Sequence, residues 1–327
     1  MIVLHVGAGK CGSSALQRFL SNNPVVELSG GQHMYYHVLT AKGAYSGADV
    51  KARAESVVHN YWSSQNFGRI CDVDFSTFFK GLSKDDVHVF SAEGWINEVS
   101  HSTIRQFLSG LNQKVKIVMY VRPQVPLMNS AYWQWGAWSD EEPRQWIMNR
   151  AKNAAKWFRK YKAFSSLDEV DECSVRILNG DIVSDFVSLF DENEFSLIKE
   201  NTSSNKSLSG ELLRVLQRNR HLRPGIHASS IDFILEKYFS GIGGPTPWVI
   251  DDELFEYIIE ECSEDNKKLL RVLDEDQADL MQADERWWKV FSVPFEVESP
   301  DAIVAKDFEN EKLLVRALEV LIENERK

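Results

Sequence analysis

A short glycine-rich stretch near the N-terminus carries the residues best suited to chemistry in this chain. It contains, in order, Gly9, Lys10, Cys11, Gly12, Ser13 and Ser14. Glycines let a backbone turn tightly and approach a ligand closely, and lysine and serine side chains donate hydrogen bonds. Residues of these types in this order predict a cradle for a phosphate-like anion.

Two regular elements must position this stretch. The apolar run Ile2–Val6 before it predicts a strand, and the amphipathic run Ala15–Leu20 after it predicts a helix that ends before Pro24. The N-terminus of a helix presents backbone N–H groups and the positive end of a dipole. An anion is therefore favoured at the turn, where Lys10 adds a full positive charge.

Polar residues also follow two later strands. Val87–Ser91 predicts a buried strand that leads to Glu93, and Val115–Val121 predicts a strand followed directly by Arg122. Ser130 comes eight residues after Arg122, in a helix predicted from about residue 126 to residue 138. Arginine offers a planar fork of donors that suits a phosphate group, and a serine hydroxyl offers one more.

Strands that alternate with helices predict an α/β fold with a parallel, doubly wound sheet. A strand at Val175–Leu178 and a long helix at Arg144–Phe164 fit this pattern, and the remainder of the chain is mostly helical. Ligands of such a sheet bind beyond the carboxyl ends of its strands, where Lys10, Glu93 and Arg122 are expected.

One domain covering residues 1–327 is the simplest organisation. Its α/β core would span about residues 1–200, and a helical part would span about residues 201–327. Residues 27–80 have poor periodicity, and we interpret them as an insertion that covers the loop.

The two polar groups together resemble the donor site of sulfotransferases that use 3′-phosphoadenosine 5′-phosphosulfate. The family's 5′-phosphosulfate motif, K-x-G-[ST]-[ST], is matched by Lys10, Gly12, Ser13 and Ser14. Arg122 and Ser130 match the arginine and serine that hold the donor's 3′-phosphate in that family. Stretches that are similar to a bacterial branch of the family are Ser91–Glu93, Arg122–Gln124, Asn201–Leu208 and Glu264–Leu269.

The resemblance implies a P-loop-like, three-layer α/β/α fold with a central parallel sheet, and an enzyme that transfers a sulfuryl group. It implies a nucleotide sulfate donor held without a metal, with Lys10 neutralising the bridging oxygen as 3′,5′-adenosine bisphosphate leaves. The donor-binding residues would be Gly9, Lys10, Cys11, Gly12, Ser13, Ser14, Arg122 and Ser130. Cys11 departs from the family's usual Lys-Thr-Gly-Thr-Thr loop, and so does the pair of serines.

Three residues compete for the role of the base that removes the acceptor's proton. Glu93 ends the strand before the arginine strand, where the family commonly places its base or the neighbours of that base. His33 and His37 are the alternatives, because some family members take a glutamate from the region a little over 20 residues after the loop lysine. The sequence leaves the choice open.

The net charge and the aromatic content indicate which classes of acceptor and partner to expect. A formal charge of −11 argues against a general binder of nucleic acid or of an anionic membrane surface, and it disfavours a heavily sulfated polymer. Aromatic faces suit sugars, lipids or phenols, although many of the ten tryptophans would simply pack in a core. We expect a neutral glycan, a glycolipid headgroup or a small hydroxylated metabolite.

A cytoplasmic location is expected, without integral membrane contact. The first predicted strand begins at residue 2, and no apolar run approaches the roughly 20 residues of a spanning helix. Cysteines 11, 71, 173 and 262 are far apart, which favours free thiols over a zinc site or a disulfide framework. The oligomeric state does not follow from the sequence.

Two other functions stay open from the sequence alone, a P-loop phosphotransferase and a non-catalytic nucleotide-binding protein. A phosphotransferase loop of the Walker type reads G-x-x-x-x-G-K-[ST], but Cys11 follows Lys10, and Leu4 occupies the position of the first glycine. We also find no apolar strand that ends in an aspartate for Mg²⁺.

Overall fold

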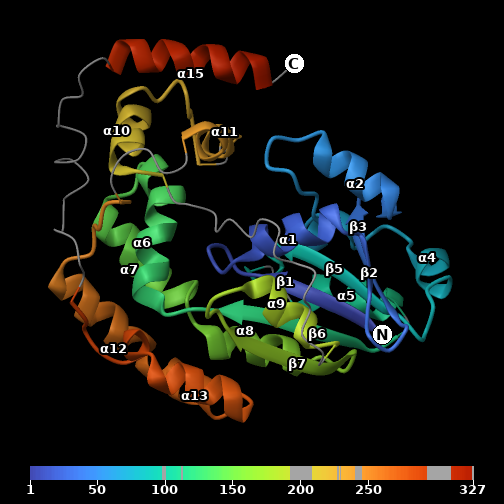
Figure 1. Ribbon diagram of the computed structural model, residues 1–327. Coiled ribbons are helices and arrows are strands. Elements are labelled where there is room, and N and C mark those ends of the chain that lie inside the picture. The colour runs from blue at the N-terminus through green and yellow to red at the C-terminus, as the bar shows by residue number, and fades with distance from the viewer. Residues whose placement is uncertain are drawn as a thin grey trace. The chain divides into compact units, whose positions relative to one another are not determined.

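The computed structural model of the chain describes residues 1–97, 101–111, 113–191, 208–226, 228, 230–239, 245–292 and 311–325 (Figure 1). Its strands are β1 (Ile2–Gly7), β2 (Val25–Glu27), β3 (His33–Thr40), β4 (Gly43–Ser46), β5 (Val87–Glu93), β6 (Val115–Val121) and β7 (Val170–Ile177). Helices of the N-terminal half are α1 (Ser13–Asn22), α2 (Ala48–Glu55), α3 (Phe67–Ile70), α4 (Ser76–Lys80), η1 (Trp95–Asn97), α5 (His101–Leu111), α6 (Gln124–Gln134), η2 (Gly136–Trp138), α7 (Pro143–Asn153) and α8 (Trp157–Ser165). The later helices are α9 (Ile182–Ser188), α10 (Gly210–Arg218), α11 (Ser230–Phe239), α12 (Asp252–Leu270), α13 (Glu275–Ala283), η3 (Glu285–Trp287) and α15 (Glu311–Glu325).

A mixed, mainly parallel sheet forms the centre of an α/β fold, as predicted. Among the described residues its strand order is β2-β3-β5-β1-β6-β7, and β4 pairs with β3 off this path. The pairs β3–β5, β5–β1, β1–β6 and β6–β7 are parallel, whereas β2 and β4 run antiparallel to β3. The carboxyl ends of β5, β1 and β6 therefore lie side by side at one edge of the sheet.

Helices cover both faces of this sheet. From β1, the chain crosses through α1 toward β3, and from β5 it crosses through α5 in the other direction to β6. Because parallel crossovers are right-handed, α1 and α5 lie on opposite faces of the sheet, which gives three layers. Every residue of β1 is buried, as expected for a central strand covered on both sides.

The segment interpreted as an insertion, residues 27–80, contains a central element of the sheet, so that interpretation is wrong. β3 pairs with β5 from Met34 to His37, and Met34, Tyr36 and Val38 are buried. The strand escaped notice because histidines and tyrosines interrupt its apolar pattern. His37 is buried all the same, because its ring meets the ring of His88 on β5.

The helix predicted over Arg144–Phe164 is two helices, α7 and α8. The carboxylate of Asp265 accepts hydrogen bonds from the N–H groups of Phe158 (2.8 Å) and Arg159 (3.1 Å), so it caps the first turn of α8. The cap comes from a residue more than 100 positions later, and a local pattern cannot reveal such a break.

The chain divides into two compact units. The first comprises the described residues within Met1–Arg122, Lys156–Ser204 and Asp265–Ala283, and the second those within Pro123–Ala155, Asn205–Glu264 and Asp284–Lys327. The first unit holds the whole sheet, and the second is helical. The single domain over residues 1–327 stays a prediction.

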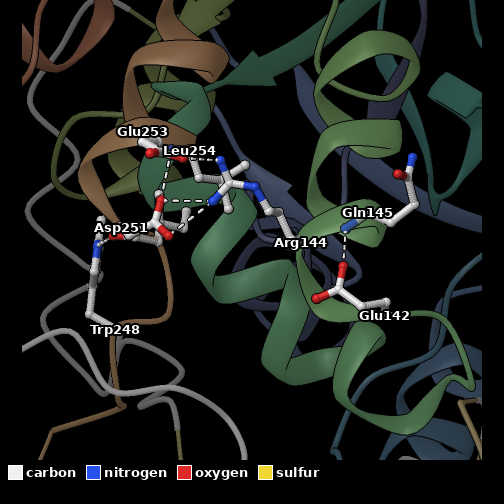
Figure 2. Close-up of polar contacts among 8 residues, drawn as sticks. Glu142, Arg144, Gln145, Trp248, Asp251, Glu253 and Leu254 are labelled. Atoms are coloured by element: carbon white, nitrogen blue, oxygen red, sulfur yellow. Dashed lines mark hydrogen bonds and ion pairs between the residues drawn. The ribbon is translucent and has the colours of Figure 1, made fainter.

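The second unit is held together by buried aromatic residues and by surface ion pairs. Trp133 and Trp138 on α6 and η2 are buried, which fits the interpretation of these tryptophans as core. Figure 2 shows Arg144 reaching Asp251 (3.0 Å) and Glu253 (2.8 Å) at the start of α12. Such exposed pairs each contribute about 0–1 kcal/mol, so they serve local order.

Within the described part of the chain, no helix is both long enough and apolar enough to cross a membrane.

Candidate active site

The glycine-rich loop joins β1 to α1 in a tight turn. Lys10 (φ 62°) and Gly12 (φ 84°) both adopt the left-handed backbone conformation, which is unusual for lysine. The N–H of Cys11 donates to the carbonyl of Ala8 at 3.1 Å, and the hydroxyl of Ser13 donates to the same carbonyl at 3.2 Å. These two bonds hold the loop in its turn.

Two glycines make room for this turn. A Cβ at Gly7 would collide with the hydroxyl of Ser13, and one at Gly12 would lie 2.7 Å from Cδ1 of Ile182 on α9. Gly12 is also the N-cap of α1, and as a glycine it has no side chain to cover the N–H groups of the first turn. The start of α1 contains no acidic residue, so the positive end of its dipole is not offset there.

The two loop serines have different surroundings. Ser13 is buried, and its hydroxyl supports the turn through Ala8. Ser14, on the first turn of α1, is partly exposed. Their predicted contact with the donor stays a prediction for both.

Cys11 points into the protein. It is fully buried, and burial raises the pKa of its thiol to about 12, a shift that nearby Glu93 strengthens and that the charges of Arg122 and Lys160 oppose. The side chain is therefore a neutral thiol at physiological pH, and its backbone N–H already bonds Ala8.

Glu93 lies beside the loop. It stands opposite Gly7 in the parallel register of β1 and β5, and the next residue, Gly94, donates its N–H to the carbonyl of Gly7 at 3.0 Å. Burial raises the pKa of the Glu93 carboxyl, and the charge of Lys10 partly offsets that effect. A carboxyl with a raised pKa is a better proton acceptor than an ordinary exposed one.

Arg122 reaches the loop from the other side. It follows β6, and its Nη1 donates to the backbone carbonyl of Lys10 at 3.1 Å. Its own carbonyl accepts a hydrogen bond from the indole N–H of Trp157 at 3.0 Å. Arg122 therefore supports the left-handed turn at Lys10, a role that the sequence did not indicate.

The structure keeps the two candidate histidines away from the loop. His33 begins β3 near Asp86 (3.8 Å), and its neighbour Met34 pairs with Val87, the first residue of β5. Glu93 ends that same strand, so about 20 Å of strand separate the two edges at about 3.3 Å per residue.

His37 lies nearer the middle of the sheet, opposite Phe90. Its Nδ1 is 2.6 Å from the Ser46 hydroxyl, and its Nε2 is 3.0 Å from Nδ1 of His88. Burial, together with the neighbouring His88, lowers the pKa of His37 to about 3. The ring is therefore neutral and enclosed at physiological pH.

Ser130 lies on α6 in the second unit and is partly exposed. Its predicted contact with a 3′-phosphate stays a prediction. The family-like stretch Asn201–Leu208 lies, except for Leu208, outside the described residues.

Lys160 on α8 is a buried cation that the sequence did not indicate. Its Nζ donates to Oδ1 of Asn97 at 2.5 Å, and its charge acts on Cys11 together with that of Arg122. A lysine in an amphipathic helix looks like a solvent-facing residue, so no sequence signal marks it.

Among the residues that the structure describes, no three or more His, Cys, Asp or Glu side chains gather as a possible metal site.

Comparisons with known proteins give one structural similarity. No protein family model matches the chain, and no curated protein is significantly similar to it. The crystal structure of a sulfotransferase from Alicyclobacillus acidocaldarius aligns with 85% of this chain and 98% of its own, at 14% sequence identity and a TM-score of 0.41. The sequence identity and the TM-score are both low, so this similarity says nothing about the activity of the chain.

Proposed function

We propose that the chain is a sulfotransferase that moves a sulfuryl group from 3′-phosphoadenosine 5′-phosphosulfate to a hydroxyl group. The observation that carries the proposal is the convergence of Lys10, Glu93 and Arg122 at the carboxyl ends of three adjacent parallel strands. Ligands of doubly wound sheets bind at such ends. A rigid anion cradle, a carboxyl and a guanidinium there provide the parts that this transfer needs.

Each part of the donor would meet a different element. Backbone N–H groups of the loop and of the first turn of α1, with Lys10, would hold the 5′-phosphosulfate. Arg122 and Ser130 would hold the 3′-phosphate, while Arg122 also keeps its bond to the loop. Because Arg122 contacts both, binding of the 3′-phosphate would stiffen the turn that positions Lys10.

The transfer is an in-line displacement at sulfur. The acceptor oxygen forms a bond to sulfur, and the bond between sulfur and the bridging oxygen breaks. Lys10 stabilises the charge that develops on the bridging oxygen, and Glu93 takes the proton of the acceptor hydroxyl. The raised pKa of Glu93 suits this task, since a base is most effective when its pKa lies closer to neutrality.

The acceptor is proposed to be a neutral glycan, a glycolipid headgroup or a small hydroxylated metabolite. The formal charge of −11 repels polyanions at long range, so a heavily sulfated chain is the least favoured acceptor. A cytoplasmic location stays the prediction made from the sequence.

Calorimetry tests the donor assignment. The wild-type protein should bind 3′,5′-adenosine bisphosphate in preference to ATP with Mg²⁺, and Arg122→Ala should bind the bisphosphate about 10- to 100-fold more weakly, because a hydrogen bond to a charged group contributes about 1.5–3 kcal/mol. Arg144→Ala, which removes an exposed arginine of the second unit, is the matched control and should bind as the wild type does. Preference for ATP, or unchanged affinity in Arg122→Ala, would contradict the proposal.

A further inference from the structure

The first turn of α8 is fixed at the carboxyl end of β6. The indole N–H of Trp157 donates to the carbonyl of Arg122 at 3.0 Å, and the Asp265 carboxylate holds the N–H groups of Phe158 and Arg159. Trp157 is buried, and its ring lies 5.8 Å from the ammonium of Lys160. Lys160 therefore starts from a helical turn with little freedom to move.

The side chain of Lys160 ends near the carboxyl end of β5. Its Nζ donates to Oδ1 of Asn97, the last residue of η1, which follows β5 with only Gly94 between them. The N–H of Asn97 donates to the carbonyl of Gly94 at 2.8 Å. One end of the lysine is thus fixed near β6, and the other end is fixed near β5.

β1 lies between β5 and β6, so Lys160 crosses the end of the strand that leads into the glycine-rich loop. The electrostatics agree with this placement, because the charge of Lys160 acts on the buried thiol of Cys11 in that loop. Lys160 is only 7% exposed, which is unusual for a lysine.

A buried ammonium is costly unless nearby groups compensate for its lost hydration. Lys10, Arg122 and Lys160 bring three positive charges to the carboxyl end of the central strands, where Glu93 supplies one carboxyl group. An anion with several oxygens is attracted to such a group of cations and can accept a hydrogen bond from each of them. A phosphosulfate group has this chemistry.

We propose that Lys160 is a further cation of the donor site, which hydrogen bonds an oxygen of the transferred sulfuryl group and stabilises its charge during transfer. This inference rests on the proposed function and adds a residue to it. Lys160 would act on the sulfuryl oxygens, whereas Lys10 acts on the bridging oxygen. Asn97 is the residue that positions the Lys160 ammonium.

Two ligands separate this role from a purely structural one. The donor carries the sulfuryl group, and 3′,5′-adenosine bisphosphate lacks it. Lys160→Met keeps an apolar stem of similar length and removes the ammonium. In this variant, single-turnover release of sulfate from the bound donor, with water as the acceptor, should slow about 100-fold, the effect of removing one preorganised charge donor. Its affinity for the bisphosphate should change by less than about threefold, or about 0.65 kcal/mol.

Lys162→Met is the matched control, because Lys162 is an exposed lysine of the same helix. It should leave the rate and the affinity unchanged. Asn97→Asp is a second variant. Because Asn97 is exposed, the new carboxylate does not become a buried charge. The carboxylate would pair with Lys160 and neutralise it, so sulfate release should slow again, and this variant decides the matter if Lys160→Met does not fold.

An unchanged rate in either folded variant would overturn the inference while leaving the proposed function in place. The inference would also be overturned if Lys160→Met lowered the melting temperature and weakened bisphosphate binding by as large a factor as it slowed the rate. A lysine with a purely structural role would behave in that way. A wild-type protein that neither binds the bisphosphate nor releases sulfate from the donor would overturn the proposed function itself, and the role of Lys160 with it.

Discussion

Ionisable groups differ between the carboxyl ends of the central strands and the region toward their amino ends. At the carboxyl edge, Glu93, Lys10 and Arg122 surround a turn held in a left-handed conformation. Toward the other edge, His37 and His88 stack on one another and on aromatic neighbours, and the pKa of His37 is lowered to about 3. β5 thus ends at Glu93, beside Lys10, and carries the His88 ring near its start.

The direction of the strands and of the following helix explains the difference. The loop after β1 leads into the N-terminus of α1, whose dipole favours an anion, and cations add to that preference. The histidine rings lie among Tyr35, Phe78 and Phe90, where a charge would lose its hydration. The buried ring of His37 packs among aromatic neighbours, and a catalytic role for Lys10, Glu93 and Arg122 is the proposal made above.

Lys10→Gln should have the largest effect. The side chain keeps a similar length but loses its charge, so transfer from the donor should slow about 100- to 1,000-fold, as when a preorganised donor is removed. Single-turnover formation of 3′,5′-adenosine bisphosphate from the donor measures this rate. Lys42→Gln is the control. It changes an exposed lysine in the turn between β3 and β4 and should leave the transfer rate unchanged. A loss below about tenfold, or 1.4 kcal/mol, would remove Lys10 from the mechanism.

Glu93→Gln should slow transfer about 100-fold, because general-base catalysis contributes at least that much. His37→Gln should leave the rate within about twofold, or 0.4 kcal/mol, since His37 lies away from the loop. The pH profile sharpens the contrast. Because the pKa of Glu93 is raised above 4.5, the wild-type rate should increase with pH through that higher pKa, and Glu93→Gln should lose this dependence. The reverse pattern would assign the base to the histidine.

Gly12→Ala should destabilise the protein by about 2 kcal/mol or more, since it adds backbone strain at φ 84° to a collision with Ile182. Gly31→Ala is the matched control before β3, because Gly31 has a φ of 76° but nothing within 4 Å of its added Cβ. It should cost only the strain, about 1–2 kcal/mol. Urea unfolding at one pH measures both. Equal losses would mean that the loop can relax around the new methyl group.

The histidines should make stability depend on pH in the opposite direction to Glu93. Between pH 6.5 and pH 3 the unfolded chain protonates His37 while the folded protein does not, so the free energy of unfolding should fall by about 1.4 kcal/mol per pH unit as pH is lowered. His37→Gln should reduce that slope by this amount, as shown by urea unfolding at several pH values. Glu93 has the opposite effect. Because its pKa is raised in the folded protein, its contribution lowers the free energy of unfolding as pH rises above 4.5 toward that higher pKa.

An unchanged slope in His37→Gln would mean that the His37 ring is not kept neutral in the folded protein. His5, a buried residue of β1 whose pKa is lowered to about 3 by burial, contributes a slope of the same sign and stays unchanged in this variant.

Local patterns predicted the elements that follow local rules. The strand, turn and helix around Lys10 were foreseen because apolar runs flank glycines, and β6 was foreseen with Arg122 at its end. β3 was missed because its histidines and tyrosines are buried through partners on other strands.

Long-range contacts account for what the sequence could not give. Lys160 hydrogen bonds Asn97, which is 63 positions away in the chain. Asp265, more than 100 positions after the start of α8, caps the first turn of that helix and so separates it from α7. The bond between Arg122 and the carbonyl of Lys10 spans 112 positions. None of these contacts can be recognised from the hydrophobic periodicity of the sequence.

A crystal structure with 3′,5′-adenosine bisphosphate bound tests the central claim most directly. We expect the 5′-phosphate in the turn between β1 and α1, with oxygens about 2.7–3.2 Å from loop N–H groups and from Lys10, and the 3′-phosphate against Arg122. A nucleotide bound near the histidines, or a turn that holds no phosphate at saturating ligand, would contradict the account.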